Sequence, residues 1–539
     1  MNLNDIDNRD QTKFRLIGKS VLAYRFIVPH DANLFVGDIV KIDDKNKKYT
    51  FYAKVIDLFH ESNFADKNWD TRPFSEQFYG LGEDVFIGVE AVPLGFIDET
   101  GTFRKPRTLP VKFSEVTLPE GKDFAFLKDL MGNIEVGVMR SGQHDLRDVP
   151  VKIPSEVLPQ HMGVFATTGM GKSNFMRVFC ASCMKEQKFG LLIVDPHGEY
   201  VRGGSSGNGK TTKGLPHYTT GKDGLAIFTI NETNRKNFGA NRLWLEYDDF
   251  RMTDLGILYD LSAAQWEVVE STEDISCSRI IPFFLTTDVE TLPDEITQNR
   301  YHGDYPDIAE KLRGFHPSTL KSIKRKIGIV VDGNRKFFRE TGSGFSEILT
   351  SLHNNKVVLI DIPQMSERSE LFVLSIITRK IMHNHREKAE KFGFDDTAEN
   401  QKNILIAIDE AQRVLAREGS STQVFRECAM EGRKFGVGLC VITQQPKNVD
   451  PKVLAQINTF VVMGLGDRGD REIVMGSAKQ DLSRMEVEIQ TLDKGEAIIS
   501  TLQIPFPVST RIHLFEEYIS ILNLQKKPKI TDGLDTGFS

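Results

Sequence analysis

Between residues 14 and 125, the hydrophobic positions fall in short runs of β-branched and aromatic residues that are separated by turn segments. The runs cover residues 21–28, 38–42, 49–57 and 85–92. Short strands at this spacing are typical of small β-barrels and sandwiches. We therefore expect an N-terminal β-barrel domain over residues 1–150.

From about residue 155 the pattern changes to apolar strands that alternate with helices. Residues 191–195, 357–362, 404–409 and 438–443 are nearly unbroken apolar runs. Such runs are expected of parallel strands that are buried on both faces. The second part of the chain is therefore predicted to be an α/β domain with a parallel sheet.

Two predicted helix starts indicate a helical insertion within this α/β domain. Ser262 and Gln265 form a capping box, and Ser318 can cap a helix that carries four basic residues. These are Lys321, Lys324, Arg325 and Lys326. A solvated helix face is favoured for them over a face that meets DNA or a partner.

The domain organisation follows from these patterns. We expect an α/β core over residues 151–250 and 351–515, a helical insertion over 251–350, and a flexible tail over 516–539.

Residues 166–174 carry the most informative motif. An apolar strand that ends at Ala166 is followed by Thr-Thr-Gly-Met-Gly-Lys-Ser-Asn and then by a helix. Glycines tolerate the dihedral angles that turn backbone N–H groups toward one anion, and the helix adds its positive N-terminal end. In this interpretation Lys172 reaches the β and γ phosphates and Ser173 ligates Mg²⁺. The predicted nucleotide-binding residues are Thr168, Gly169, Met170, Gly171, Lys172, Ser173 and Asn174.

A second stretch, residues 204–211, matches the G-x4-G-K-T pattern letter for letter, whereas the first has Ala166 in place of a glycine. No apolar strand leads directly into this second stretch, and Gly214 and Pro216 after it oppose a helix. We therefore expect a surface loop over residues 203–216 and place the phosphate site at Lys172.

Two carboxylates follow a second buried strand, which ends at Ile408. In a doubly wound sheet, ligands bind at the C-terminal ends of the strands. Asp409 is predicted to hold Mg²⁺, and Glu410 to orient and activate an attacking water. The alternative for Asp409 is a cap on a helix that begins at Ala411.

Four more polar residues are candidates for the same site. Gln444, at the tip of the next strand, is predicted to sense the γ phosphate; its alternative is a turn residue before Pro446. Arg433 is predicted to act as an arginine finger across a subunit interface; its alternative is a surface ion pair. Asp195 and Glu199 follow a buried strand and can lie near the metal and the water.

Composition restricts the partners and the compartment. The net charge is −7, so any DNA contact has to be local, as in a basic channel. No apolar run approaches the roughly 18 residues that span a bilayer, and the N-terminus lacks a signal-peptide pattern. The five cysteines form no disulfide framework. We expect a cytoplasmic protein with no membrane contact.

Taken together, the motifs resemble the HerA family of hexameric DNA translocases, which are relatives of the FtsK group among the RecA-like P-loop ATPases. The resemblance covers almost the whole chain, and its N-terminal part is similar to the family's barrel domain. The matching segments are Ala166 to Asn174, Asp195 to Tyr200, Ile408 to Gln412, Glu431 to Gly436 and Thr443 to Pro446. Two positions differ from the family pattern: Gln412 replaces a frequent histidine, and Gly464 replaces a frequent arginine, for which Arg468 or Arg471 could substitute.

The resemblance implies a homohexameric ring that binds ATP and Mg²⁺ between subunits and moves double-stranded DNA through a central pore. Arg433 would then act on the neighbour's nucleotide, and Lys447, Lys452 and Lys479 are candidates for the pore lining. It also implies a nuclease or sirtuin-like effector docked on the N-terminal barrel, in DNA end processing or antiphage defence. The alternative is an ATP-switched hexameric scaffold that assembles and regulates the effector.

Overall fold

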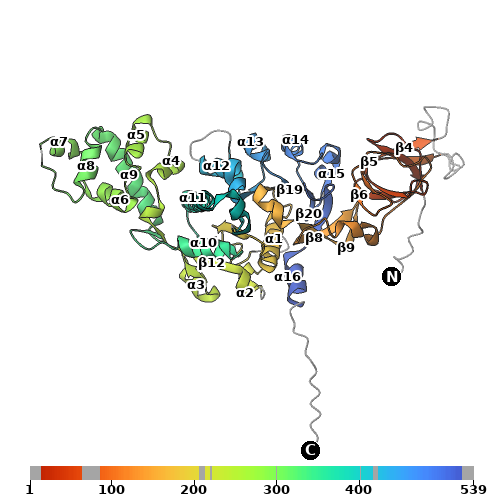
Figure 1. Cartoon of the computed structure of the whole chain (residues 1–539), viewed down its shortest axis with the longest axis horizontal. Helices are drawn as coiled ribbons and strands as arrows, with labels where there is room; N and C mark the ends of the chain where they lie inside the picture. The colour runs from red at the N-terminus through yellow and green to blue at the C-terminus, as the bar shows by residue number, and fades with distance from the viewer. Residues whose placement is uncertain are drawn as a thin grey trace, which may run out of the picture.

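The computed structural model describes residues 14–62, 85–204, 213–218, 221–298, 300–400, 402–416 and 423–524. A β-barrel lies at one end of the molecule, an α/β core in the middle and a helical insertion at the other end (Figure 1). Most of the second G-K-T stretch, residues 205–211, lies outside the described residues.

The N-terminal part is a closed barrel of six strands, in the order β2-β1-β7-β3-β4-β5, and pairing of β2 with β5 closes it. A short strand, β6, adds to β5. The strands are β1 (Phe14–Leu16), β2 (Tyr24–Pro29), β3 (Ile39–Asp44), β4 (Tyr49–Ser62), β5 (Val85–Ile97), β6 (Phe103–Arg104) and β7 (Glu115–Thr117). Apolar side chains at alternate positions fill its interior, including Tyr24, Phe26 and Phe51. The predicted barrel is confirmed.

The core is built on a sheet of twelve strands, in the order β13-β12-β16-β11-β17-β18-β10-β19-β20-β21-β8-β9. The first eight strands of this order are parallel, and the last four pair in antiparallel fashion. Their bounds are β8 (Ile134–Ser141), β9 (His144–Ile153), β10 (Met162–Ala166), β11 (Gly190–Asp195), β12 (Leu225–Thr229), β13 (Asn241–Arg242), β16 (Val357–Asp361), β17 (Ile404–Ile408), β18 (Val437–Thr443), β19 (Thr459–Met463), β20 (Glu496–Thr501) and β21 (Val508–Ile512). The predicted parallel α/β core is confirmed.

Helices cover both faces of this sheet. One face packs with α1 and α16, and the other packs with α10, α11 and α12. The core helices are α1 (Lys172–Glu186), α2 (Gly221–Gly224), α3 (Glu232–Phe238), α10 (Phe345–His353), α11 (Glu367–Asn400), α12 (Gln423–Glu431), α13 (Pro451–Leu454), α14 (Arg468–Ser477), α15 (Glu486–Thr491) and α16 (Phe515–Leu524). None of the helices described is both long and apolar enough to cross a membrane.

The insertion is helical, as predicted, and its buried side chains are continuous with those on one face of the sheet. It contains α4 (Leu255–Leu258), α5 (Ala263–Ser271), α6 (Cys277–Thr286), α7 (Leu292–Thr297), α8 (Pro306–Leu312) and α9 (Pro317–Asn334), between the paired strands β14 (Leu245–Glu246) and β15 (Phe338–Arg339). Ser262 and Gln265 do form the capping box of α5.

The predicted cap of α9 is wrong. The N-cap is His316, whose Nδ1 accepts the backbone N–H of Ser318, and the helix begins at Pro317. Proline suits the first helical position, so the helix starts at Pro317 and the N-cap lies two residues before the predicted Ser318. The basic residues of α9 contact their own insertion: Lys321 pairs with Glu290, and Lys324 donates to the carbonyl of Thr287.

The hairpin of β8 and β9 belongs to the core sheet, although most of it precedes the predicted domain boundary at residue 150. Its pairing with β21 carries the twelve-stranded sheet to the base of the barrel (Figure 1). The barrel strands therefore end at Thr117, and residues 134–153 extend the core.

A buried charge network joins the barrel to the core. The carboxylate of Glu488 on α15 lies 2.8 Å from Lys54 Nζ of the barrel and 3.2 Å from a guanidinium nitrogen of Arg140. It also accepts the hydroxyl of Ser509. Burial favours a higher pKa for Glu488, but Lys54, Ser509 and Arg140 outweigh it and lower the pKa. The Glu488 carboxylate is therefore charged, and Lys54, Arg140 and Ser509 all contact it.

We predict that Glu488→Ala destabilises the protein by about 3–5 kcal/mol, because it leaves the buried Lys54 without its counter-charge. The midpoint of urea unfolding should fall markedly. Glu472→Ala, which removes an exposed ion pair with Arg468, should change the midpoint little. Equal midpoints for the two variants would contradict this account of the junction.

Candidate functional site

The loop between β10 and α1 is shaped to receive an anion. Gly169 and Gly171 have φ of +86° and +104°, a region that glycine adopts without strain. No atom lies within 4 Å of the position that a Cβ on Gly169 would occupy. Helix α1 begins at Lys172, so its first N–H groups face the same space. The residues present therefore fit a nucleotide phosphate.

Neighbouring segments hold this loop from outside. The N–H of Thr167 donates to the carbonyl of Gly464 at 3.1 Å, and the N–H of Gly495 donates to the carbonyl of Met170 at 3.0 Å. These backbone contacts come from the segments that follow β19 and precede β20. The loop is therefore fixed between two strands of the sheet.

Lys172 lies between the two predicted acidic residues. Its Nζ is 2.8 Å from Asp409 Oδ1 and 3.2 Å from Glu410 Oε1. Burial favours a lower pKa for Lys172, but the two carboxylates outweigh it and raise the pKa. The ammonium is therefore charged, and it already lies beside the open space of the phosphate loop.

Glu410 has a strained backbone and a fully bonded side chain. Its φ of 48° and ψ of 45° are left-handed, which is costly for a residue with a side chain. Oε2 accepts Gln412 Nε2 at 2.6 Å, and Oε1 accepts Gln444 Nε2 at 2.7 Å. Burial favours a higher pKa, but Gln412, Lys172 and Gln444 outweigh it and lower the pKa of Glu410. An ionised carboxylate of this kind can accept a proton from water.

Gln444 links the acidic residues to the phosphate loop. Its amide oxygen accepts the hydroxyl of Thr168, and its amide nitrogen donates to Glu410. The predicted residues Thr168, Lys172, Asp409, Glu410 and Gln444 are thus brought together by the structure. Their roles in catalysis stay predictions.

Ser173 and Asp409 are suitable in chemistry for Mg²⁺. Both are exposed, and Ser173 stands in the first turn of α1. The described residues contain no group of three or more His, Cys, Asp or Glu side chains that could hold a metal alone. A cation bound here would therefore take its other ligands from phosphate oxygens and water, which is the usual environment of Mg²⁺ in ATPases.

Asp195 has its carboxylate engaged in a turn. Its two oxygens accept the backbone N–H groups of Glu199, Tyr200 and Val201 at 3.0–3.1 Å. Burial raises the pKa of Asp195 to about 6 although these bonds oppose the rise. Asp195 therefore organises the turn that carries Glu199, whose half-buried side chain follows in that turn.

Asn174 also has a structural contact that the sequence did not indicate. Its side-chain amide donates to the carbonyl of His513 at 2.8 Å and accepts the N–H of Phe515 at 3.0 Å. The side chain therefore anchors the start of α16, and only the backbone of Asn174 is left to meet a nucleotide.

Arg433 lies at the opposite edge of the sheet. It precedes β18, whereas Gln444 follows the end of this strand. Seven residues at about 3.3 Å each separate the two edges by roughly 20 Å. Arg433 instead lies near His161, whose pKa falls to about 4 through burial and the nearby positive charge. The exposed guanidinium therefore does not take part in the site of its own chain.

Gly464 packs directly on the phosphate loop. A Cβ at this position would come within 2.3 Å of the terminal methyl of Met170, so the flexible Met170 side chain would have to move to admit a larger residue. Arg471 is buried and donates to the carbonyls of Leu465 and Gly466. Arg471 is therefore bonded within this turn, whereas Arg468 is exposed. Whether either arginine substitutes at position 464 stays a prediction.

The three lysines predicted for a pore differ in their contacts. Lys447 Nζ lies 3.3 Å from Asp467, and Lys479 Nζ donates to the carbonyl of Ala455 at 2.6 Å. Lys452 lies exposed near the start of α13. Their relation to a pore stays a prediction.

Three site residues were not predicted from the sequence. Gln412 and Thr443 hydrogen-bond to each other beside Glu410. Glu370, at the start of α11, has a raised pKa, mainly through burial, and Asp409 contributes to the rise. Of these three, only Gln412 could have been suspected from the sequence, because it lies two residues after Glu410.

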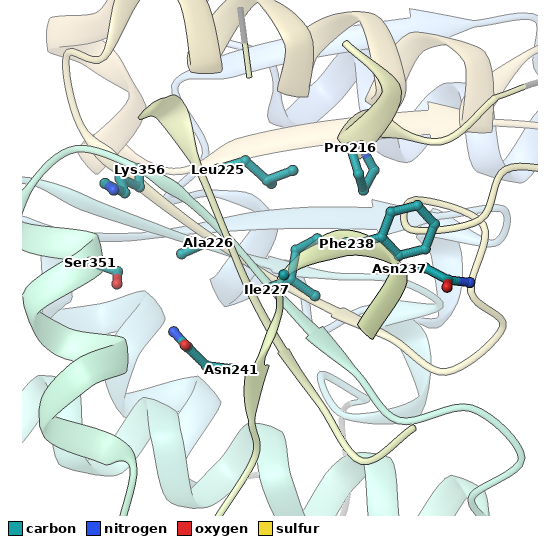
Figure 2. Close-up of a pocket in the computed structure, with 10 residues that line it drawn as sticks. Pro216, Leu225, Ala226, Ile227, Asn237, Phe238, Asn241, Ser351 and Lys356 are labelled. Carbon is teal, nitrogen blue, oxygen red and sulfur yellow. The ribbon is translucent and has the colours of Figure 1, made fainter. Parts of the chain in front are cut away.

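A separate cavity of about 490 Å³ lies at the outer strand β12. Figure 2 shows Leu225, Ala226 and Ile227 of this strand along it, with Phe238 and Lys356 also at its lining. Lys356 precedes β16, so the cavity is at the N-terminal ends of the parallel strands. It shares no residue with the phosphate site.

The chain is similar in sequence to several helicases. Residues 134–381 match the family model for the central domain of the helicase HerA. The DNA double-strand break repair helicase HerA of Pyrococcus furiosus is 23% identical, over 92% of this chain and 91% of that protein. A probable helicase of Methanocaldococcus jannaschii is 23% identical, over 71% of each chain.

Among solved structures, the bacterial conjugative coupling protein TrwB matches with a TM-score of 0.45 and 15% identity, over 73% of this chain and 92% of that one. The family model covers the phosphate loop and the strand that leads into it, and the likeness to HerA proteins extends over the barrel and the acidic strand. The chain is therefore similar to the HerA helicases, over residues 134–381 by the family model and over most of its length in the Pyrococcus protein.

Proposed function

We propose that this protein is an ATP-driven translocase or helicase on double-stranded DNA that works as a homohexameric ring. The observation that carries the proposal is the contact of Lys172 with Asp409 and Glu410 beside the open phosphate loop. It is the arrangement that phosphoryl transfer to water requires. The name of the Pyrococcus relative supports DNA break processing as the biological setting.

In the proposed reaction, the phosphate loop and Lys172 hold the triphosphate. Ser173 and Asp409 would hold Mg²⁺, which when bound would neutralise phosphate charge. Glu410 orients a water molecule and accepts its proton as the oxygen attacks the γ phosphorus. The bond to the β-phosphate oxygen breaks, and ADP and phosphate leave. Gln444, which contacts Glu410 and Thr168, is placed to report the loss of the γ phosphate.

The ring is supported by the position of Arg433. Because it stands at the edge of the sheet away from its own Lys172, a neighbouring copy would have to supply an arginine to each site. An effector, either a nuclease or a sirtuin-like enzyme, would dock on the barrel, in DNA end processing or antiphage defence.

A second candidate is an ATP-switched scaffold that assembles and regulates such an effector. It is favoured by the net charge of −7 and by Gly464, which stands where the family often has an arginine. In that case the effector would stay active in a complex with an ATPase-dead ring.

We predict that Lys172→Ala and Glu410→Gln each lower ATP turnover at least about 100-fold. Lys172→Ala should also weaken binding of a non-hydrolysable ATP analogue. Glu410→Gln should bind the analogue as the wild type does, because glutamine has the shape of glutamate and loses only the ability to accept a proton from water. Steady-state ATPase assays with double-stranded DNA and analogue titrations measure both effects. Glu472→Gln, an exposed carboxylate on α14, is the matched control. Wild-type turnover in Glu410→Gln would reject the proposal.

We predict that Arg433→Ala is inactive alone but complements Lys172→Ala in mixed rings. When the two variants are mixed in equal amounts, each interface has an intact Lys172 with a probability of about one half and an intact Arg433 with a probability of about one half. Roughly a quarter of the interfaces in a randomly assembled ring therefore have both. ATPase activity should therefore recover to about that fraction of wild type. Lys434→Ala serves as a neighbouring control that should stay active. A mixture no more active than its components would show that Arg433 does not act across an interface.

A further inference from the structure

Gln412 lies at the centre of a directed chain of hydrogen bonds. The backbone N–H of Gln445 donates to Thr443 Oγ1 at 3.0 Å, so this hydroxyl has its hydrogen available for another acceptor. Thr443 Oγ1 in turn lies 2.6 Å from Gln412 Oε1, and Gln412 Nε2 lies 2.6 Å from Glu410 Oε2. Because a carboxylate only accepts hydrogen bonds, the amide of Gln412 has one orientation that satisfies both ends.

The base of this chain is rigid. Thr443 is the last residue of β18 and is fully buried. Strands β17 and β18 are parallel neighbours, with Ile408 opposite Val441. Thr443 therefore belongs to the central sheet. It contacts the amide oxygen of Gln412, whereas Glu410 contacts the amide nitrogen.

The other contacts of Glu410 involve groups that meet the nucleotide. Lys172 and Gln444 both approach Oε1, and each has a proposed role toward phosphate. In the part of the chain that the structure describes, Gln412 is the only residue that donates a hydrogen bond to Oε2. When Lys172 turns to phosphate, the bond from Gln412 can persist, because neither Gln412 nor Thr443 faces the phosphate loop in the contacts above.

We propose that Gln412 is a positioning residue. By holding Oε2, it keeps Glu410 in its left-handed conformation and directs Oε1 toward the attacking water once Lys172 has turned to phosphate. This inference rests on the proposed function, since it assigns Gln412 a part in the same hydrolysis. Thr443 acts one step further out, by fixing the amide of Gln412. Neither residue contacts ATP.

The first test is Gln412→Met, which keeps nearly the same volume and removes both hydrogen bonds. Loss of such an outer contact typically reduces activity about 10- to 100-fold. We expect kcat to fall by that amount while KM for ATP and the affinity for a non-hydrolysable analogue change less than about threefold, because the nucleotide contacts remain. An unchanged kcat overturns the inference.

Gln480→Met is the matched structural control. The Gln480 amide is also half-buried and bonded at both ends, to the carbonyl of Ile504 and the hydroxyl of Ser500. Its loss should lower the unfolding temperature without the fall in kcat. If both variants lower kcat to the same extent, the effect of Gln412 is general destabilisation and the inference is wrong.

The second test addresses the chain of bonds. Thr443→Val should reduce kcat in the same direction as Gln412→Met, and Thr443→Ser, which keeps the hydroxyl, should restore it. The double variant Gln412→Met with Thr443→Val should be no slower than Gln412→Met alone, because Thr443 acts through Gln412. Additive losses would contradict this order. If Gln412→Met does not fold, Gln412→Asn, which is too short to span both partners, must give the same fall in kcat.

Glu410→Gln separates the two proposals. If this variant hydrolyses ATP normally, the proposed function fails whatever Gln412 does. If it is inactive while Gln412→Met has the kcat of wild type, only the positioning role of Gln412 is rejected.

Discussion

The ion pair of Lys172 with Asp409 and Glu410 is the constraint on which the rest of the site depends. It joins the phosphate loop, which follows β10, to the acidic end of β17, two strands away in the sheet. Without nucleotide, two carboxylates face one ammonium, so the cluster has a net negative charge. A triphosphate adds more negative charge, and the carboxylates can release Lys172 to it only if another cation compensates them. Under the proposed function, we therefore expect nucleotide binding at this site to depend on a divalent ion.

The same ion pair shows why the sequence could predict that these residues lie together. The phosphate loop and the pair Asp409-Glu410 each follow an apolar strand, and parallel strands bring their C-terminal ends to one edge. Local chemistry and strand direction were sufficient for Lys172, Asp409, Glu410 and Gln444. The contact of Gln412 with Thr443 needed the additional fact that β17 and β18 are neighbours, which periodicity alone does not provide.

Residues whose partners are distant in sequence were less predictable. Asn174 bonds to residues 513 and 515, and Arg471 bonds to a turn beside the phosphate loop. Both look like free polar groups in the sequence. The hairpin of β8 and β9 illustrates the same limit at the level of domains, because only its pairing with β21 places it in the core. Patterns of burial predict that a strand exists, but not which sheet receives it.

The candidate functional residues lie at two opposite edges of the sheet. Lys172, Glu410 and Gln444 stand at the C-terminal ends of the strands, while Arg433 stands at the N-terminal end of β18. Arg433 is too far from the phosphate loop of its own chain to stabilise the negative charge that develops on the γ phosphate. Under the proposed function, a neighbouring copy must therefore supply this arginine. Gln444 contacts both Thr168 and Glu410, so under the proposed function a change at the nucleotide would act on the end of β18, the strand that begins beside Arg433. In the proposed ring, β18 would therefore be the physical link between one nucleotide site and the next.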